Sequence, residues 1–342
     1  MDEGSTKIMT YTSHYSVLKK ECLDSMYADW EESNEENLLF ADLTFGGGGH
    51  SLAIVERDKR ANLISFDQDP DALANGRKLI KEKGFEDRHH LVDSNFCHFG
   101  EVVKGQYQEL VDKCGGFSAI LMDLGVSSHH FDEGNRGFSF RVDAPLDMRM
   151  DSDNDEVPTA QHIVNTYSEI ELERIFKEFG EEKFSKRIAK KIAEQREDKP
   201  IETTFELAEL VKYCYPIKLR YGRINPATKT FQALRIEVNR ELHVLSEVIP
   251  QIIPLLKING KICVISFHSL EDRIVKHEFK KIEKNSVDSE DEIYEVVTKK
   301  PIVPGEVELD ENPRSRSAKL RVIKRVSERK VKNKYAKFST VK

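Results

Sequence analysis

The sequence predicts an α/β fold in which a parallel sheet is interrupted by an inserted helical domain, and three observations lead to this expectation. A short apolar run at 38–43 turns through Gly46, Gly47, Gly48 and Gly49 into a helical pattern at 51–57. Apolar strands then alternate with helical patterns as far as residue 123, which is typical of a parallel sheet. The alternation stops between about residues 130 and 224, and afterwards a further strand follows.

The first part of the chain supplies four expected strands. An amphipathic helix at 15–26 comes first, and besides the helix at 51–57 a further helix is expected at 71–83. The strands are expected at 38–43, 61–66, 89–92 and 117–122. The second strand ends at Asp67 and the fourth at Asp123, so two carboxylates follow buried strands.

Residues 130–224 read as a helical insertion without a convincing strand. A loop rich in Gly and Asp at 132–155 precedes helical patterns at 168–179 and 182–196. We therefore predict a core of 1–129 and 225–330, an insertion of 130–224, and a basic tail of 331–342.

The chain after the insertion is expected to complete the sheet. One long amphipathic helix is predicted over 230–256, followed by a fifth parallel strand at 261–267. Ser269 is expected to begin a helix, with Asp272 as its capping-box partner. A polar loop at 285–292 precedes a half-buried closing strand at 317–326.

Composition limits the class of protein. The 342 residues are 39% hydrophobic and 33% charged, and no apolar run approaches the roughly 20 residues that span a bilayer. The N-terminal stretch is acidic and has no apolar segment typical of a secretory signal. The five cysteines are scattered and none is spaced as C-x-x-C, which argues against a zinc site. These features predict a cytoplasmic protein with reduced thiols, no membrane segment and no metal.

Charge is distributed unevenly. The net charge is −7, but residues 314–342 hold twelve Lys or Arg and one acid, which leaves −18 on the remainder. A basic tail on an acidic body is typical of a polyanion-binding element. For 331–342 alone, a solvated end is the simpler interpretation.

The glycine turn predicts a cofactor site. Glycine has no Cβ, so its N–H groups can approach a ligand closely, and a strand, a glycine-rich turn and a helix start form a nucleotide cradle in doubly wound folds. The simpler alternative is a turn that merely needs glycine. Four consecutive glycines between Asp42 and His50 disfavour that alternative, although they do not identify the cofactor.

Three further residues are candidates beside this turn. Asp67 lies where a carboxylate accepts both ribose hydroxyls of a nucleoside, although alone it could equally be a surface acid. Phe96 follows the third strand and could pack on an adenine ring or simply in the core. Asp123 could accept a proton or hydrogen bond from an amine, or bind the amino acid part of a cofactor. His129 and His130 read as ordinary loop histidines, since no Cys/His cluster accompanies them.

Several longer strings identify a resemblance that extends from residue 14 to about 325. The sequence resembles the methyltransferases of the RsmH, or MraW, type, which use S-adenosylmethionine to methylate the exocyclic N4 of a cytidine in small-subunit ribosomal RNA. The strings in question are DLTFGGGGHS at 42–51, DQDP at 67–70, DLGVSS at 123–128, RGFSF at 136–140, PLDMRM at 145–150, TKTFQALR at 228–235, SFHSLEDR at 266–273 and NPRSRS at 312–317.

The resemblance implies a class I, Rossmann-like methyltransferase sheet and assigns a cofactor site. It implies that S-adenosylmethionine contacts Gly48, Gly49, His50, Asp67, Phe96, Asp123 and His130. At position 130 the family usually has a glutamine, after a proline that is His129 here. The Pro-Pro-Tyr motif of the DNA amino-methyltransferases is absent, so their base-stacking aromatic has no counterpart in this sequence.

The chemistry of this reaction gives Asp123 a catalytic role. The lone pair of an exocyclic amine is delocalised into the ring, and an acceptor that hydrogen-bonds the amine makes the nitrogen more reactive. Placement in line with the methyl donor supplies much of the remaining rate. The base must sit unstacked in a pocket, which single-stranded or looped RNA allows most easily.

Basic residues are the candidates for RNA contact. Lys183, Lys186, Arg187, Lys190 and Lys191 recur at helical spacing in the insertion, and such a face is either solvated or a phosphate footprint. Lys218, Arg220 and Arg223 follow, and a second cluster is predicted from Arg314, Arg316, Lys319, Arg321, Lys324 and Arg325. We expect Lys186, Arg187, Lys190, Arg223, Arg314 and Arg316 to bind substrate RNA, within an assembled or nearly assembled small-subunit particle.

Two rival functions are compatible with parts of the sequence. A nicotinamide-dependent oxidoreductase would also use a glycine-rich turn and a distal acid, but the G-x-G-x-x-G string fails at Ser51. A ribosome-assembly factor that binds RNA without catalysis is the second rival.

Overall fold

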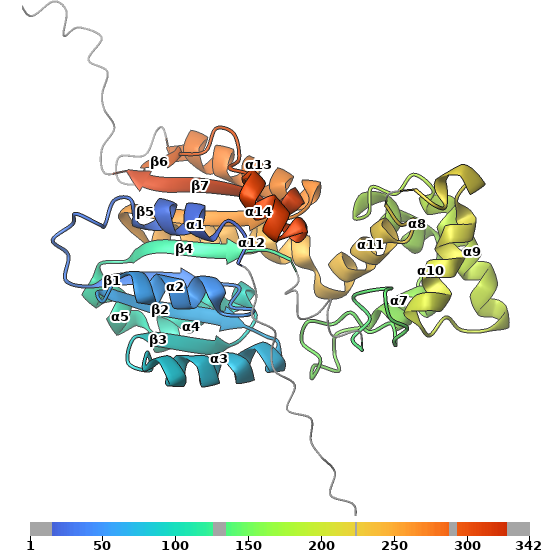
Figure 1. Cartoon of the computed structure of the whole chain (residues 1–342), viewed down its shortest axis with the longest axis horizontal. Helices are drawn as coiled ribbons and strands as arrows, with labels where there is room; N and C mark the ends of the chain where they lie inside the picture. Colours follow the sequence, from blue (N-terminus) through green and yellow to red (C-terminus); the bar gives the residue numbers. More distant parts are fainter. Residues whose placement is uncertain (1–15, 126–134, 223, 287–292, 327–342) are drawn as a thin grey trace, which may run out of the picture.

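The computed structural model describes residues 16–125, 135–222, 224–286 and 293–326. Within them the chain forms one seven-stranded sheet with helices on both faces and a separate group of helices at one end of the sheet (Figure 1). The predicted tail at 331–342 lies outside the described residues.

The sheet is parallel over five of its strands. The strands are β1 (Leu38–Asp42), β2 (Ala61–Asp67), β3 (His89–Asp93), β4 (Phe117–Asp123), β5 (Leu256–Ser266), β6 (Ile293–Val296) and β7 (Lys319–Val326). Their order is β3-β2-β1-β4-β5-β7-β6, and β7 runs antiparallel to both of its neighbours. The carboxyl ends of β1 to β5 therefore meet at one edge, and the strand order reverses between β1 and β4, which is where doubly wound sheets bind ligands.

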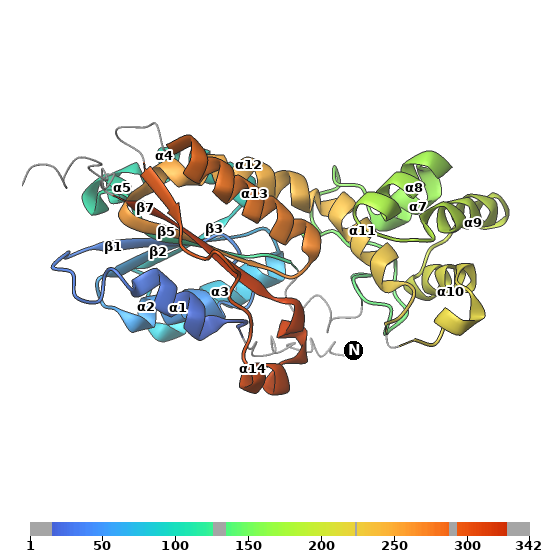
Figure 2. The same cartoon turned by 90° about the horizontal axis from the view of Figure 1, so that it is seen from above.

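Helices cover both faces of the sheet, as Figure 2 shows. One face carries α1 (Lys19–Tyr27), α2 (Gly49–Arg57) and α3 (Pro70–Lys83). The other carries α4 (Phe99–Gln106), α5 (Gln108–Cys114), α12 (Glu241–Ile252) and α13 (Ser269–Asn285). This is the Rossmann-like arrangement of class I methyltransferases, as the sequence predicted.

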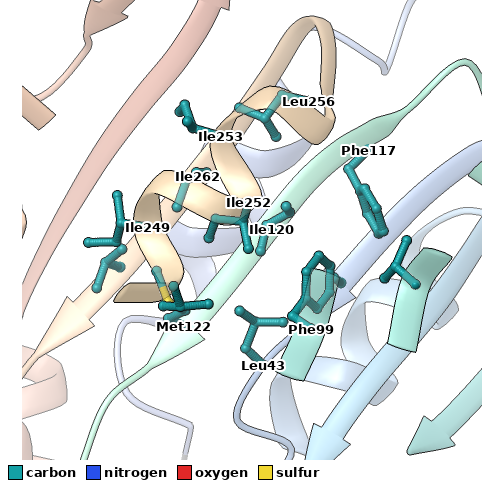
Figure 3. Close-up of a cluster of buried hydrophobic side chains, with 14 of the residues drawn as sticks. Leu43, Phe99, Phe117, Ile120, Met122, Ile249, Ile252, Ile253, Leu256 and Ile262 are labelled. Carbon is teal, nitrogen blue, oxygen red and sulfur yellow. The ribbon is translucent and has the colours of Figure 1, made fainter. Parts of the chain in front are cut away.

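A dense apolar core fixes the sheet. Phe99, Phe117 and Ile120 belong to one buried cluster with the isoleucines of α12, among them Ile249 and Ile252 (Figure 3). All of these side chains are fully buried, and burying each one stabilises the fold by about 1.5–3 kcal/mol. This packing holds β2 and β4 in fixed positions, and with them Asp67 and Asp123 at their carboxyl ends.

The helical insertion has an apolar core of its own. It comprises α7 (Ala160–Thr166), α8 (Glu169–Glu178), α9 (Ser185–Asp198), α10 (Thr204–Cys214) and α11 (Thr228–Asn239). No strand occurs among the described residues between β4 and β5. The buried side chains of α11, such as Leu234, join this second cluster. By packing, the insertion therefore extends to Asn239, whereas the predicted boundary was at 225. The division into independent domains stays a prediction.

The single long helix predicted over 230–256 is wrong. Arg240 adopts φ 50°, in the left-handed region, and it ends α11 and precedes α12. Its N–H donates to the carbonyl oxygens of Ile236 and Glu237, as in a helix C-cap. A 3-10 helix at Ile253–Leu255 follows α12, and β5 has already begun at Leu256.

Three other details near the C-terminal end differ from the predictions. The capping box of α13 uses His268 and Glu271, because Asp272 instead pairs with Lys319 and Arg321. The strand β7 does not close the sheet but lies between β5 and β6. The strand β6 and the helix α14 (Glu306–Glu311) were not predicted from the sequence.

Short 3-10 helices complete the described structure. They span Phe96–His98, Ile217–Leu219 and Pro313–Ser317. Among the helices of the described residues, none has both the length and the apolar character needed to cross a bilayer.

Candidate active site between the sheet and the insertion

A cavity of ≈ 560 Å³ lies where the carboxyl ends of the strands meet the helical insertion. Its sheet side is formed by the glycine turn, Asp67, Phe96 and Asp123. Its insertion side includes Phe138, Phe140 and Phe231. Both halves of the chain therefore contribute walls to one space.

The glycine turn has a backbone that only glycine adopts easily. Gly46 and Gly48 have φ 50° and 76°, and a Cβ on Gly48 would lie 2.6 Å from the ring of Phe45. Gly48 is the N-cap of α2, and Gly49 is its first residue. The glycines therefore let the chain turn sharply from β1 into α2, whose first residues, Gly49 and His50, line the cavity.

Asp67 connects this turn to the end of β2. Its Oδ2 accepts a hydrogen bond from the backbone N of Gly46 at 2.7 Å, and its Oδ1 accepts from the backbone N of Asp69 at 2.9 Å. Asp67 is only half-buried and lines the cavity. It thus orders the glycine turn in addition to facing the space where a ribose is expected.

His50 and Asp123 form a buried pair on the cavity wall. The Nε2 of His50 lies 3.5 Å from Oδ2 of Asp123, and His50 is only 5% exposed. Burial alone would lower the pKa of His50, but the neighbouring Asp123 and then Asp42 raise that pKa above its usual value. Within the described residues, Nδ1 of His50 and Oδ1 of Asp123 are buried without a hydrogen-bond partner. Such atoms in a cavity indicate a place for a polar ligand.

A series of hydrogen-bonded, buried polar side chains lies next to the glycine turn. Ser51 Oγ donates to Asp42 Oδ2 at 2.7 Å and lies 2.8 Å from Ser65 Oγ, which in turn lies 2.8 Å from His89 Nε2. Burial raises the pKa of Asp42, and burial lowers the pKa of His89 to about 3. The series links β1, α2, β2 and β3, so it fixes the elements that carry the glycine turn.

Phe96 lines the cavity just after β3 and also packs against the core cluster. The side-chain amide of the preceding Asn95 donates to Oε1 of Gln68 at 2.8 Å. This bond ties the Phe96 segment to the DQDP string at the end of β2. His130, the remaining cofactor candidate, lies outside the described residues, as does His129.

The insertion is attached to the edge of the sheet by Arg136. Its Nη1 donates to Oδ1 of the buried Asp69 at 2.9 Å, and its Nη2 donates to the carbonyl oxygens of Arg149 and Met150. At the adjacent Gly137, with φ 77°, a Cβ would lie 2.4 Å from a backbone oxygen. Arg136 thus connects the strings at 136–140 and 145–150 to each other and to Asp69 at the edge of the sheet.

Aromatic side chains form the insertion wall of the cavity. Phe140 and Phe231 pack edge to face, with ring centroids 4.9 Å apart and an interplanar angle of 76°. Phe231 is buried in α11, whereas Phe140 is half-exposed. This wall can offer a planar ligand a surface for stacking.

A group of charged side chains completes the wall near the end of β5. The guanidinium of Arg235 is bound by both carboxylate oxygens of Glu241, at 2.8 and 2.9 Å. His268 and Glu271 lie beside them, and one ligand atom from each of Glu241, His268 and Glu271 falls within 4.8 Å of the others. Arg235 supplies a positive charge to Glu241 within this group.

The predicted RNA-binding residues do not gather at the cavity. Lys186, Arg187 and Lys190 lie exposed on α9, at the far side of the insertion. Arg314 lines the cavity and Arg316 is exposed nearby in the 3-10 helix at Pro313–Ser317, while Arg223 lies outside the described residues.

Four cations of the second basic cluster have partners within the fold. Lys319 and Arg321 pair with Asp272, and Lys324 pairs with Asp29 at 2.6 Å. Arg325 donates to the carbonyl oxygen of Leu256. These four cations hold β7 in place, and only Arg314 and Arg316 remain as candidates from that cluster.

The aromatic wall and the charged group around Arg235 were not predicted from the sequence. Apart from Glu241, their residues come from strings that carried the resemblance, at 136–140, 228–235 and 266–273, but no spacing rule indicated that these strings meet. The signal available was that the strings combine aromatic and charged residues.

Comparison with known proteins gives one consistent result. The model of the MraW methylase family matches residues 11–326. A protein of Lachnospira eligens named "Ribosomal RNA small subunit methyltransferase H" is 44% identical over 324 residues, which cover 92% of this chain and 98% of that protein. Proteins of the same name from Clostridioides difficile and Sulfurihydrogenibium sp. are 43% and 48% identical, each covering 92% of this chain and 99% of its own length.

Proposed function

The chain belongs to the MraW methylase family, and on that premise we propose that it transfers a methyl group from S-adenosylmethionine to the exocyclic N4 of a cytidine in small-subunit ribosomal RNA. The name of the relatives supports small-subunit ribosomal RNA as the substrate. The cytosine N4 and the cofactor rest on the resemblance of the motifs and on the site.

One observation carries the proposal. A single cavity brings the glycine turn, Asp67 and Asp123 at the sheet edge together with the aromatic wall of the insertion. A nucleoside-containing cofactor fits the first wall, and an unstacked base fits the second. Asp123 lies at the end of β4, where the two would meet.

The residues at the sheet edge fit S-adenosylmethionine. Gly46, Gly47 and Gly49 of the turn line the cavity, Asp67 offers a carboxylate at the end of β2, and Phe96 offers an apolar surface. The unpartnered Nδ1 of His50, near the start of α2, suits the polar amino acid end. When bound, the sulfonium of this cofactor supplies an electrophilic methyl group and a good leaving group.

The chain's own contribution to the reaction is placement and hydrogen bonding. We assign Asp123 to accept a hydrogen bond from the target amine, which raises the nucleophilicity of the nitrogen. The aromatic wall of Phe140 and Phe231 offers the cytosine a stacking surface that replaces the adjacent RNA bases from which it is unstacked. His50 lies beside this carboxylate, with its Nε2 3.5 Å from Oδ2 of Asp123.

The rival functions find less support. Membership of a methylase family does not favour a nicotinamide-dependent oxidoreductase. A purely binding assembly factor would have no need for the buried pair of His50 and Asp123 at the cavity wall.

Two measurements test the proposal. Calorimetric titration with S-adenosylmethionine and with NAD should give saturable binding of the first only. Incubation with small-subunit particles and labelled cofactor, followed by nucleoside mapping, should yield N4-methylcytidine. Binding of NAD in place of S-adenosylmethionine, or RNA binding without methyl transfer, would support a rival instead.

A further inference from the structure

The outer end of the insertion exposes large apolar side chains that no mechanism above uses. Tyr213 at the end of α10 is 58% exposed, and Tyr221 is 81% exposed. Ile217, Leu219 and Ile224 between and beside them are at least half exposed. A cluster of exposed large apolar residues over so short a segment is typical of an interaction surface.

Cations lie over both tyrosine rings. The guanidinium carbon of Arg220 is 5.0 Å from the ring centroid of Tyr213, and Nζ of Lys212 is 5.4 Å from that of Tyr221. Arg220 is held in place, because its Nε donates to the carbonyl oxygen of Tyr215 at 2.9 Å. The rings are therefore positioned side chains that still expose more than half of their surface.

The tyrosines adjoin the basic face of α9. A groove of ≈ 400 Å³ between α9 and α10 is lined by Lys191 and Tyr213. Glu206 and Glu209 also line it, and they pair with Lys199 and Lys212. Lys186, Arg187 and Lys190 lie exposed along α9, while Ile188 and Ile192 face its core. Glu194 pairs with Lys190 and Lys191, and no acid pairs with Lys186 or Arg187 among the described residues.

This surface is remote from the cavity. Figures 1 and 2 both place α9 and α10 at the end of the insertion that faces away from the sheet. None of its residues lines the cavity. A ligand on this surface would therefore not be the target base.

We propose that Lys186, Arg187, Lys190, Lys191, Tyr213 and Tyr221, the α9–α10 surface, bind an unpaired segment of ribosomal RNA at a distance from the methylated nucleotide. The inference rests on the proposed function for the choice of RNA. Phosphates suit the row of cations, and the exposed tyrosine rings suit the faces of unstacked bases. A duplex hides those faces, so the tyrosines distinguish single strands from helical RNA.

The test compares paired variants in binding to a short, labelled single-stranded RNA and to a hairpin of the same composition. Tyr213→Ala combined with Tyr221→Ala should weaken single-strand binding by at least about tenfold, because stacking contributes about 1–3 kcal/mol per base. Tyr213→Phe with Tyr221→Phe keeps both rings and should retain wild-type affinity. Hairpin binding should be weaker than single-strand binding in the wild type and should change little in either variant.

A matched control uses Ile170→Ala, which removes an 81% exposed apolar side chain from α8 of the same insertion and should leave RNA binding unchanged. With particles as substrate, the alanine pair should raise KM and leave kcat and cofactor affinity near wild type. Unchanged single-strand binding in the alanine pair would overturn the proposal. If oligonucleotide binding stays unchanged while particle binding falls, the partner is a ribosomal protein and the RNA assignment is wrong.

The outcome is separable from that of the proposed function. Failure of methyl transfer by the wild type would remove the proposed reaction, whereas the oligonucleotide measurement reports on the α9–α10 surface alone.

Discussion

The sheet edge and the outer face of the insertion place their polar and charged side chains in opposite environments. At the sheet edge, Asp42, His50 and His89 are buried, and their partners lie on neighbouring strands and helices. On α9, Lys186 and Arg187 are exposed on a helix whose other face packs into an apolar core.

The difference separates chemistry from attachment. Buried polar groups interact strongly and hold fixed positions, so the sheet edge can orient a cofactor and a reacting base. Exposed cations are screened by salt and adapt to a flexible polyanion. Changes at the edge should therefore alter turnover or cofactor binding, whereas changes on the insertion should alter RNA affinity and its salt dependence.

The largest effect is expected at Asp123. With saturating cofactor, Asp123→Asn should lower kcat by roughly 10²-fold or more, because the amide is a poor acceptor for the target amine. Cofactor affinity should remain nearly intact. Asp93→Asn is the matched control, since Asp93 also ends a parallel strand of the same sheet, β3, but is exposed and does not line the cavity.

Single-turnover rates and cofactor titrations distinguish the two roles of Asp123. If this carboxylate only anchors the cofactor, the loss should appear in binding and largely disappear at saturation. Near wild-type turnover at saturation would contradict the catalytic role.

Asp67 should give the next effect, confined to cofactor binding. Asp67→Ala should weaken S-adenosylmethionine binding by about 1–3 kcal/mol, because it leaves polar groups unpaired. It also removes the acceptor for the backbone N of Gly46, so Asp67→Asn, which keeps one oxygen, should lose less. An unchanged dissociation constant in a folded Asp67→Ala protein, measured by calorimetry, would end the ribose assignment.

The sequence predicted these two acids because their signals are local. Each of β1, β2 and β4 is a short apolar run, and an acid at or just after such a run lies at the carboxyl end of a parallel strand. The aromatic wall was not predictable in this way. Phe140 and Phe231 are far apart in the chain, and only the folding of α11 against the loop at 136–150 brings them together.

The break at Arg240 shows a second limit of the sequence. Residues 230–256 keep a helical apolar pattern, but α11 packs in the insertion and α12 packs on the sheet. The chain must turn between them, and it does so with an arginine in a conformation that favours glycine. Tertiary packing therefore overrides the local periodicity.

A smaller effect should appear in the pH dependence of stability. Burial lowers the pKa of His89 to about 3 in the folded protein, against about 6.5 in the unfolded chain. The folded state therefore holds this histidine neutral, and its contribution to the free energy of unfolding is complete above about pH 6.5. That contribution is lost as the pH falls from about 6.5 towards 3. Between pH 7 and 5 the wild type should lose about 2 kcal/mol more than His89→Gln. Urea unfolding of both proteins at each pH measures this difference, and equal losses would contradict it.

The smallest effect is expected on α9. Neutralising Lys186, Arg187, Lys190 and Lys191 to glutamine should weaken particle binding by about tenfold at low salt, and flatten the salt slope by about 0.7–0.9 for each lost phosphate contact. Cofactor affinity should not change, because none of the four lines the cavity. A salt slope identical to that of the wild type would make this face ordinary solvated surface.

The central claim is that one cavity brings the cofactor at the sheet edge to a cytosine held against the insertion. It is tested most directly by incubating the protein with small-subunit particles and S-adenosylmethionine carrying a labelled methyl group, then digesting the RNA to nucleosides. The account predicts label in N4-methylcytidine, at a single position, and its loss in Asp123→Asn. Label on another atom or nucleoside, or no transfer by a protein that binds both the cofactor and the particles, would contradict it.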